Sequence, residues 1–108
     1  FVLWSRIDQK SGLKAIVTAG FVPVVIPLSR RGEELRVDLE AMAAKIAELG
    51  PDKIVAVLST TSCFAPRIPD NLIRIGELCG GIIPHLVNNA YGLQSSRCVQ
   101  LLNGAAFD

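Results

Sequence analysis

Three segments of the sequence gather the side chains that could do chemistry. Each follows a short apolar run, and they span residues 5–11, 59–67 and 88–92. Small polar side chains are frequent in them, where plain turns would carry mainly glycine and proline. In parallel α/β sheets, ligands bind beyond the carboxyl ends of the strands. If the apolar runs are strands of one such sheet, the three segments meet at a common ligand site.

The elements that must position these segments follow from the hydrophobic pattern. Runs rich in valine and isoleucine predict four strands, at residues 1–4, 22–26, 54–58 and 85–87. Their almost continuous hydrophobicity is typical of a sheet that is covered on both faces. The polar segments would then lie at the ends of three of the four strands.

Helical periodicity fills the intervals between these strands. The clearest helix covers residues 38–49, where apolar residues recur at three- and four-residue spacing before a Gly-Pro pair. Two more are predicted at 10–19 and at 69–79, the latter opening with Asp70, and a fourth begins after Gly92. This alternation predicts an α/β fold, a mostly parallel sheet with helices on both faces and right-handed crossovers.

Composition supports a folded core. Half of the 108 residues are apolar and 19% are charged, which is unlike a disordered chain. The chain starts at Phe1 inside an apolar run, with no turn or capping residue before it. We therefore expect residues 1–108 to be a fragment of one domain of a larger protein.

Charge and cysteine content limit the possible partners and compartments. The net charge is +1 and the basic residues are scattered, so this segment is not expected to be the main contact with a nucleic acid. Three cysteines without a C-x-x-C pair argue against a disulfide framework and a zinc site. No apolar run reaches the length that spans a bilayer, so no membrane association is expected. A reducing, cytoplasmic setting fits these features best.

Two common phosphate-binding motifs are absent from the sequence. Neither G-x-G-x-x-G nor G-x-x-x-x-G-K-[ST] occurs, so no run of glycine amides is set to cradle the phosphates of a nucleotide. The polar segments therefore need another explanation.

The polar segments resemble, in order, three motifs of fold-type I pyridoxal-phosphate enzymes. Residues 86–92, L-V-N-N-A-Y-G, look like a V-D-x-A-Y-G strand end whose aspartate pairs with the pyridine nitrogen. Residues 9–15, Q-K-S-G-L-K-A, are similar to an H-x-S-x-x-K-A segment whose histidine stacks on the cofactor ring. Residues 59–62 resemble a G-T-T-S loop near the phenolic oxygen. Asn88 and Gln9 stand at the aspartate and histidine positions.

These two replacements, together with S-T-T-S-C-F-A-P-R at residues 59–67, resemble the O-phosphoseryl-tRNA(Sec) selenium transferase family. The resemblance implies that the chain is part of the large, cofactor-binding domain of a pyridoxal-phosphate enzyme. That enzyme would convert O-phosphoseryl-tRNA(Sec) to selenocysteinyl-tRNA(Sec) with selenophosphate as the selenium donor. The resemblance also implies a homotetramer whose tRNA contacts lie mostly outside this segment.

The cofactor-binding residues implied by the resemblance are Gln9, Thr60, Thr61, Asn88 and Ala90. Asn88 would contact the pyridine nitrogen, Gln9 and Ala90 the two faces of the ring, and the threonine pair its phenolic edge. In the family, the lysine that carries the cofactor and the phosphate loop lie outside the stretch that corresponds to residues 1–108. No catalytic residue or metal ligand is therefore assigned, and the fragment is expected to be inactive alone.

Asparagine in place of aspartate has a chemical consequence. An aspartate keeps the pyridine nitrogen protonated and makes the ring a strong electron sink, whereas a neutral amide stabilises that proton far less. We therefore expect a weaker sink at Asn88. Phosphate is a good leaving group, so a weaker sink suffices for its elimination and limits side reactions such as transamination.

Other interpretations of the same residues stay open on local grounds. Asn88 with Asn89 is also typical of a turn, Gln9 of a helix start, and the pair Thr60 and Thr61 of a cap. Two other functions therefore remain. One is a different fold-type I enzyme, such as a decarboxylase or a cysteine-forming tRNA-dependent transferase, and the other is a non-catalytic α/β binding module.

Several further residues are of chemical interest. His85, the sole histidine, opens an apolar strand and is expected to be structural. Cys63 is expected to be an inert buried thiol, and the charged stretch at 30–34 a solvated loop. Arg67 and Arg97 adjoin the polar segments, which raises the hypothesis that one of them contacts an anion.

Overall fold

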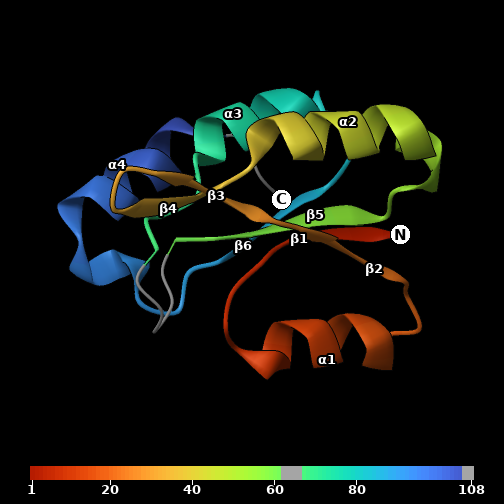
Figure 1. Cartoon of the computed structure of the whole chain (residues 1–108), viewed down its shortest axis with the longest axis horizontal. Coiled ribbons are helices and arrows are strands. Elements are labelled where there is room, and N and C mark those ends of the chain that lie inside the picture. Colours follow the sequence, from red (N-terminus) through yellow and green to blue (C-terminus); the bar gives the residue numbers. More distant parts are fainter. Residues whose placement is uncertain (62–66, 106–108) are drawn as a thin grey trace.

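The computed structural model describes residues 1–61 and 67–105 and contains a four-stranded parallel sheet (Figure 1). In spatial order its strands are β2 (Pro23–Ile26), β1 (Val2–Ser5), β5 (Ala56–Thr60) and β6 (His85–Asn88). All three neighbouring pairs are parallel. The carboxyl ends of β1, β5 and β6 therefore meet at one edge of the sheet.

Helices cover both faces of the sheet (Figure 1). α1 (Lys10–Thr18) lies against one face, whereas α2 (Leu39–Leu49) and α3 (Leu72–Cys79) lie against the other. α4 (Ser96–Gly104) lies beyond the carboxyl ends of the strands. Two short 3-10 helices complete the described elements: η1 (Pro51–Lys53) and η2 (Gly92–Gln94). The predicted fold class is confirmed. In the described part of the chain, no helix has the length and apolar character needed to cross a membrane.

Successive side chains of the central strands alternate between two cores. Leu3 and Val57 belong to the core under α2 and α3, where Met42 is also buried. Trp4 belongs to the core on the α1 side, together with Ile16 of α1 itself. Because the side-chain period of a strand is two, each strand presents its last two residues to opposite faces. This alternation decides which side chains can meet at a ligand site.

Helix and strand boundaries lie close to those that the sequence predicts. Asp38 caps α2 by accepting the backbone N–H of Ala41 at 2.9 Å, and Gly50 follows the helix with a φ of 86°. Each of the four predicted strands is shifted by at most two residues from its observed bounds. The hydrophobic pattern is therefore sufficient to place the elements of the sheet.

The third helix begins later than predicted. α3 starts at Leu72, and its cap is Asn71, whose side chain accepts the N–H of Arg74 at 3.2 Å. Asp70, which was expected to open the helix, is instead buried and bound to β5 and to Arg67. Aspartate and asparagine are equally good caps, so the local sequence does not distinguish the two positions.

The charged stretch after β2 forms part of a β-hairpin, so the prediction that it is a loop is wrong. β3 (Leu28–Arg31) pairs antiparallel with β4 (Glu34–Val37), and Arg31 lies opposite Glu34. Gly32 opens the two-residue turn with a φ of 63°, a backbone conformation that favours glycine. The hairpin extends from the same edge of the sheet as the predicted ligand site (Figure 1).

Candidate functional site

Three of the predicted cofactor residues lie on the α1 side of the sheet. Leu58 of β5 packs against the α1-side core, and Thr60, two residues later, points to the same side. Asn88 of β6 pairs directly with Thr60, so its side chain shares that face. Gln9 immediately precedes α1. The parallel register thus places Thr60 and Asn88 side by side, and Gln9 lies on the same side of the sheet at the start of α1.

Asn88 connects the ends of β5 and β6. Its carbonyl oxygen accepts the N–H of Thr61 at 3.1 Å and the hydroxyl of Thr60 at 3.3 Å. Its side-chain Oδ1 accepts the N–H of Ala90 at 3.3 Å. Because that oxygen already accepts a hydrogen bond from the protein, the side-chain NH2 group is the part of Asn88 that could bind a ligand. An NH2 group is a hydrogen-bond donor, so a ligand here must offer an acceptor.

Thr61 is engaged on the side of Asn89 and α4. Its side chain is fully buried, and its hydroxyl donates to Asn89 Oδ1 at 2.8 Å. The Cys98 thiol of α4 approaches the Thr61 carbonyl at 3.7 Å. Thr61 therefore anchors the turn after β6 and the start of α4. Its contact with a cofactor stays a prediction.

Gly92 allows the turn after β6 to pack against Thr61. A Cβ atom at position 92 would lie 1.9 Å from Asn89 Oδ1 and 2.5 Å from Thr61 Oγ1. We expect Gly92→Ala to displace both side chains and destabilise the full-length protein by about 1–3 kcal/mol, seen as a lower midpoint of thermal unfolding. Gly104→Ala is the control, since its nearest contact is the flexible end of Ile73 at 3.3 Å. Equal effects of the two substitutions would contradict the close packing at Gly92.

Gln9 borders an open hollow of about 510 Å³ beside α1. Trp4 and Leu13 contribute apolar surface to this hollow, and Arg6 and Lys10 contribute charge. Gln9 is half-buried, and its side chain makes no capping hydrogen bond with the helix that follows. A planar amide beside an apolar wall suits one face of an aromatic ring.

A buried ion pair lies behind the same strand ends. The Arg67 guanidinium pairs with the Asp70 carboxylate, and their side chains are 1% and 0% exposed. Burial raises the pKa of the Asp70 carboxyl above its ordinary value, and the charge of Arg67 and the N–H of Thr60 only partly offset that rise. Arg67 ends the S-T-T-S-C-F-A-P-R stretch, but nothing in the sequence indicated that it pairs with Asp70.

The guanidinium of Arg67 is fully engaged by the protein. Nε donates to the carbonyl of Ile68 at 3.3 Å, and both terminal nitrogens donate to the hydroxyl of Ser5 at 3.3 Å. The remaining contacts are to the carbonyl of Arg6 and to Asp70. These contacts occupy all five N–H groups of the side chain. The hypothesis that Arg67 contacts an anion is therefore not supported.

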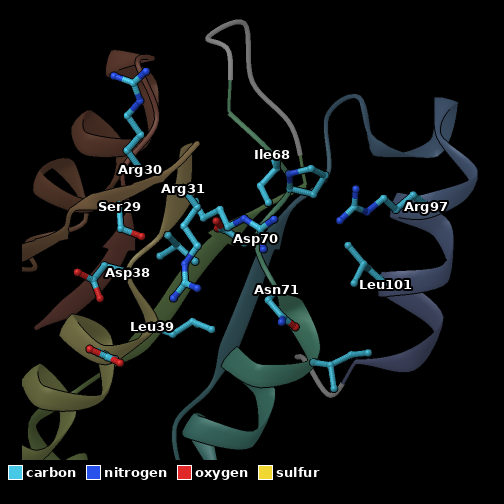
Figure 2. Close-up of a pocket in the computed structure, with 15 residues that line it drawn as sticks. Ser29, Arg30, Arg31, Asp38, Leu39, Ile68, Asp70, Asn71, Arg97 and Leu101 are labelled. Carbon is cyan, nitrogen blue, oxygen red and sulfur yellow. The ribbon is translucent and has the colours of Figure 1, made fainter. Parts of the chain in front are cut away.

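A second hollow, of about 790 Å³, lies between the β3–β4 hairpin and α4 (Figure 2). Its lining mixes arginine and carboxylate side chains: Arg30, Arg31, Arg36, Arg97, Asp38, Glu40 and Asp70. In Figure 2 Arg97 extends from α4 toward the hairpin, whereas Arg30 extends away from the hollow. The Asp70 carboxylate is already paired with Arg67, and Arg36 is paired with Glu34. Charges of both signs therefore remain in this hollow, and they do not by themselves identify a ligand.

The remaining residues of chemical interest have structural roles. His85 is buried with its Nε2 2.7 Å from the Ser59 hydroxyl, as expected for a structural histidine. Cys79 and Cys98 are buried cysteines on helices. Cys63 lies outside the described residues. Within residues 1–61 and 67–105, no cluster of histidine, cysteine and carboxylate side chains could hold a metal ion.

The groups at the strand ends fit the ring of pyridoxal phosphate. The Asn88 NH2 group would donate to the pyridine nitrogen, which is an acceptor when it carries no proton. Thr60 points to the same side of the sheet, but its side chain is buried and its hydroxyl donates to the Asn88 carbonyl, so its contact with the ring stays a prediction. Gln9 would offer its planar amide. These three side chains are uncharged, so they suit the ring and not the phosphate of the cofactor.

Residues 1–107 match the family described as O-phosphoseryl-tRNA(Sec) selenium transferase, SepSecS. The chain belongs to this family. The selenium transferase of Dictyostelium discoideum is 55% identical over 106 residues, which are 97% of this chain and 22% of that protein. The crystal structure of an archaeal SepSecS has a TM-score of 0.86 at 27% identity, over 96% of this chain and 24% of that one. The SepSecS assignment made from three short motifs is thus confirmed.

Mouse CSAD shares the fold with this SepSecS chain. Its crystal structure in apo form has a TM-score of 0.74 at 20% identity, over 95% of this chain and 23% of the mouse chain. The predicted fold, that of fold-type I enzymes, is confirmed by these neighbours. The chain spans less than a quarter of the length of each of these three relatives, so it corresponds to only part of a SepSecS protein.

Proposed function

We propose that this chain is part of an enzyme that uses pyridoxal phosphate to convert O-phosphoseryl-tRNA(Sec) to selenocysteinyl-tRNA(Sec), with selenophosphate as the selenium donor. The observation that carries the proposal is the direct pairing of Thr60 with Asn88, which sets both side chains on the face that α1 and Gln9 also occupy. These are three of the residues that the family resemblance assigns to the cofactor.

Asn88 is the residue that sets the electronic character of the site. A bound pyridoxal phosphate would supply an electron sink for the α-carbon of the substrate, which would be stronger with a protonated ring nitrogen. Because Asn88 Oδ1 accepts the N–H of Ala90, the group that the side chain would offer to the ring nitrogen is its NH2 donor. A donor would pair with the unprotonated nitrogen, so Asn88 would make the ring a weaker electron sink than an aspartate would. Loss of phosphate from phosphoserine requires no more than that.

Ala90 leaves room for the face of the ring opposite Gln9. Its position is fixed by the hydrogen bond from its N–H to Asn88 Oδ1. We expect Ala90→Leu to weaken cofactor binding by about tenfold or more, equivalent to about 1.4 kcal/mol, because the larger side chain occupies the space of the ring. The measurement is an absorbance titration of the full-length protein with pyridoxal phosphate.

The control for this substitution is Leu93→Ala, a change of the same size at a neighbouring residue that is 74% exposed. It should leave the dissociation constant within about twofold. An Ala90→Leu protein that binds the cofactor as tightly as the wild type would remove Ala90 from the pocket.

The partners and the setting form part of the same proposal. The tRNA(Sec) that carries O-phosphoserine contacts mostly other parts of the longer protein, which the net charge of +1 on this segment supports. The assembly is a homotetramer, as the family resemblance implies. A cytoplasmic location is supported by the cysteine content, because three cysteines without a C-x-x-C pair are not typical of a disulfide framework.

The test uses the full-length protein that contains this chain. Loaded with pyridoxal phosphate, it should show the visible absorbance of a lysine-bound cofactor and form selenocysteinyl-tRNA(Sec) only when selenophosphate is present. A visible chromophore with release of carbon dioxide from a free amino acid would favour a decarboxylase instead. The absence of both chromophore and product would favour a non-catalytic module.

A further inference from the structure

We infer that Arg67 and Asp70 are positioning residues for the cofactor pocket, acting through the backbone at the ends of β1 and β5. The inference rests on the proposed function, since it concerns the site that Gln9, Thr60 and Asn88 are proposed to form. Neither residue is among the cofactor-binding residues that the family resemblance implies, although Arg67 ends the S-T-T-S-C-F-A-P-R stretch at residues 59–67.

Asp70 holds the end of β5 by two reciprocal hydrogen bonds. Its carboxylate Oδ2 accepts the N–H of Thr60 at 2.9 Å, and its own N–H donates to the carbonyl of Thr60 at 3.0 Å. Thr60 and Asp70 are therefore joined by hydrogen bonds in both directions. These two hydrogen bonds fix the orientation of both peptide groups that flank the Thr60 side chain.

Arg67 extends the same unit to the end of β1. Its guanidinium binds Asp70, the hydroxyl of Ser5 at 3.3 Å and the carbonyl of Arg6. Ser5 is the last residue of β1, and residues 6–8 connect it to Gln9. One buried ion pair thus fixes the strand ends from which two of the proposed cofactor residues project.

The ion pair lies on the opposite side of the sheet from the proposed pocket. Ser5, two residues after Leu3, points toward the α2 and α3 side of the sheet, and Arg67 meets it there. Thr60 and Asn88 point toward the α1 side. Arg67 therefore reaches the pocket only through the backbone, which distinguishes it from a ligand of the cofactor.

An ion pair suits this task better than apolar packing of the same volume. Charge-assisted hydrogen bonds are directional, and the guanidinium fork fixes several acceptors at once. Apolar side chains could bury the same surface, but they would not define the direction of the Thr60 N–H or the Arg6 carbonyl. Loss of the pair should thus disorder the geometry of the pocket.

The test compares the full-length wild type with Asp70→Asn and Arg67→Lys. Three quantities are measured for each protein: the dissociation constant of pyridoxal phosphate, the visible circular dichroism of the bound cofactor, and the thermal midpoint without cofactor. We expect both variants to bind the cofactor about tenfold more weakly, with reduced visible dichroism. Arg67→Lys keeps the charge with fewer donors, so it tests orientation with the least disturbance of folding.

Arg74→Met is the matched control. Arg74 pairs with Glu77 at the same three-residue spacing, but these side chains are 61% and 55% exposed. This variant should keep wild-type cofactor affinity and dichroism.

The outcomes separate this inference from the proposed function. If Asp70→Asn and Arg67→Lys lose thermal stability yet bind the cofactor with wild-type affinity and dichroism, the pair is only structural and the inference is overturned. If Asp70→Asn does not fold, Arg67→Lys decides by the same criteria. A wild-type protein that binds no pyridoxal phosphate would instead refute the proposed function.

Discussion

Replacement of Arg67 by methionine is expected to destabilise the full-length protein, and to do so more at neutral than at acid pH. The substitution leaves the Asp70 carboxylate buried without its cationic partner. Removing one member of a buried ion pair costs about 3–5 kcal/mol, because an uncompensated charge remains in the interior. The loss is measured as the difference in thermal midpoint from the wild type across a series of pH values.

The pH dependence follows from the pKa of Asp70. Burial already raises this pKa in the wild type, and loss of the Arg67 charge raises it further. When the folded pKa of a carboxyl exceeds the unfolded one, the folded state binds more protons between the two values, and stability falls as pH rises across that interval. The deficit of Arg67→Met should therefore be smallest near about pH 4 and grow toward neutrality.

A control keeps this prediction specific to the buried pair. Arg74→Met removes an exposed partner of Glu77, and such surface pairs contribute about 0–1 kcal/mol. Its midpoint should stay close to that of the wild type at every pH. A deficit of Arg67→Met that is constant from acid to neutral pH would show that Asp70 is not the group left uncompensated.

Replacement of Asn88 by aspartate should change which reaction the full-length enzyme performs. A carboxylate beside the pyridine nitrogen stabilises its proton, where the Asn88 NH2 group favours the unprotonated form. We expect transamination to increase about tenfold relative to elimination, equivalent to about 1.4 kcal/mol between the two barriers. The measurement is the ratio of pyridoxamine phosphate formed to inorganic phosphate released from O-phosphoseryl-tRNA(Sec).

Asn89→Asp provides the matched control for charge. The new carboxylate keeps the oxygen that accepts the Thr61 hydroxyl, and it adds the same charge one residue further along the chain. The product ratio should stay close to that of the wild type. If Asn88→Asp also leaves the ratio unchanged, the amide does not set the electronic character of the site.

The sheet could be predicted because its strands are buried on both faces and so appear as continuous apolar runs. The β3–β4 hairpin could not be found in this way, since its strands carry charged residues and contribute few apolar side chains to the core. The available signal was local: Gly32-Glu33 has the Gly-X form of a two-residue hairpin turn. A charged stretch that contains such a pair is therefore a strand candidate as well as a loop candidate.

Some residues of the candidate site could be predicted from the sequence, and others could not. Family motifs indicate Gln9 and Asn88, and the parallel register then explains how residues so far apart in sequence reach one face. The same motifs treat Thr60 and Thr61 as one unit, whereas the structure engages the Thr61 hydroxyl with Asn89. The contact of Arg67 with Ser5 spans 62 positions, and it depends on how the chain returns across the sheet. No local pattern encodes such a contact.

The position of β6 has a consequence for how the pocket is completed. Thr60 and Asn88 stand on the last two strands of the sheet, and among the described residues β6 has no neighbour on its far side. Leu86, which points to the same face as Asn88, is 44% exposed. Within the described residues, β6 is therefore an edge strand, and the proposed cofactor site lies beside its unpaired side. In the longer protein, a further strand can pair with this side of β6 through backbone hydrogen bonds and supply the opposite side of the proposed site.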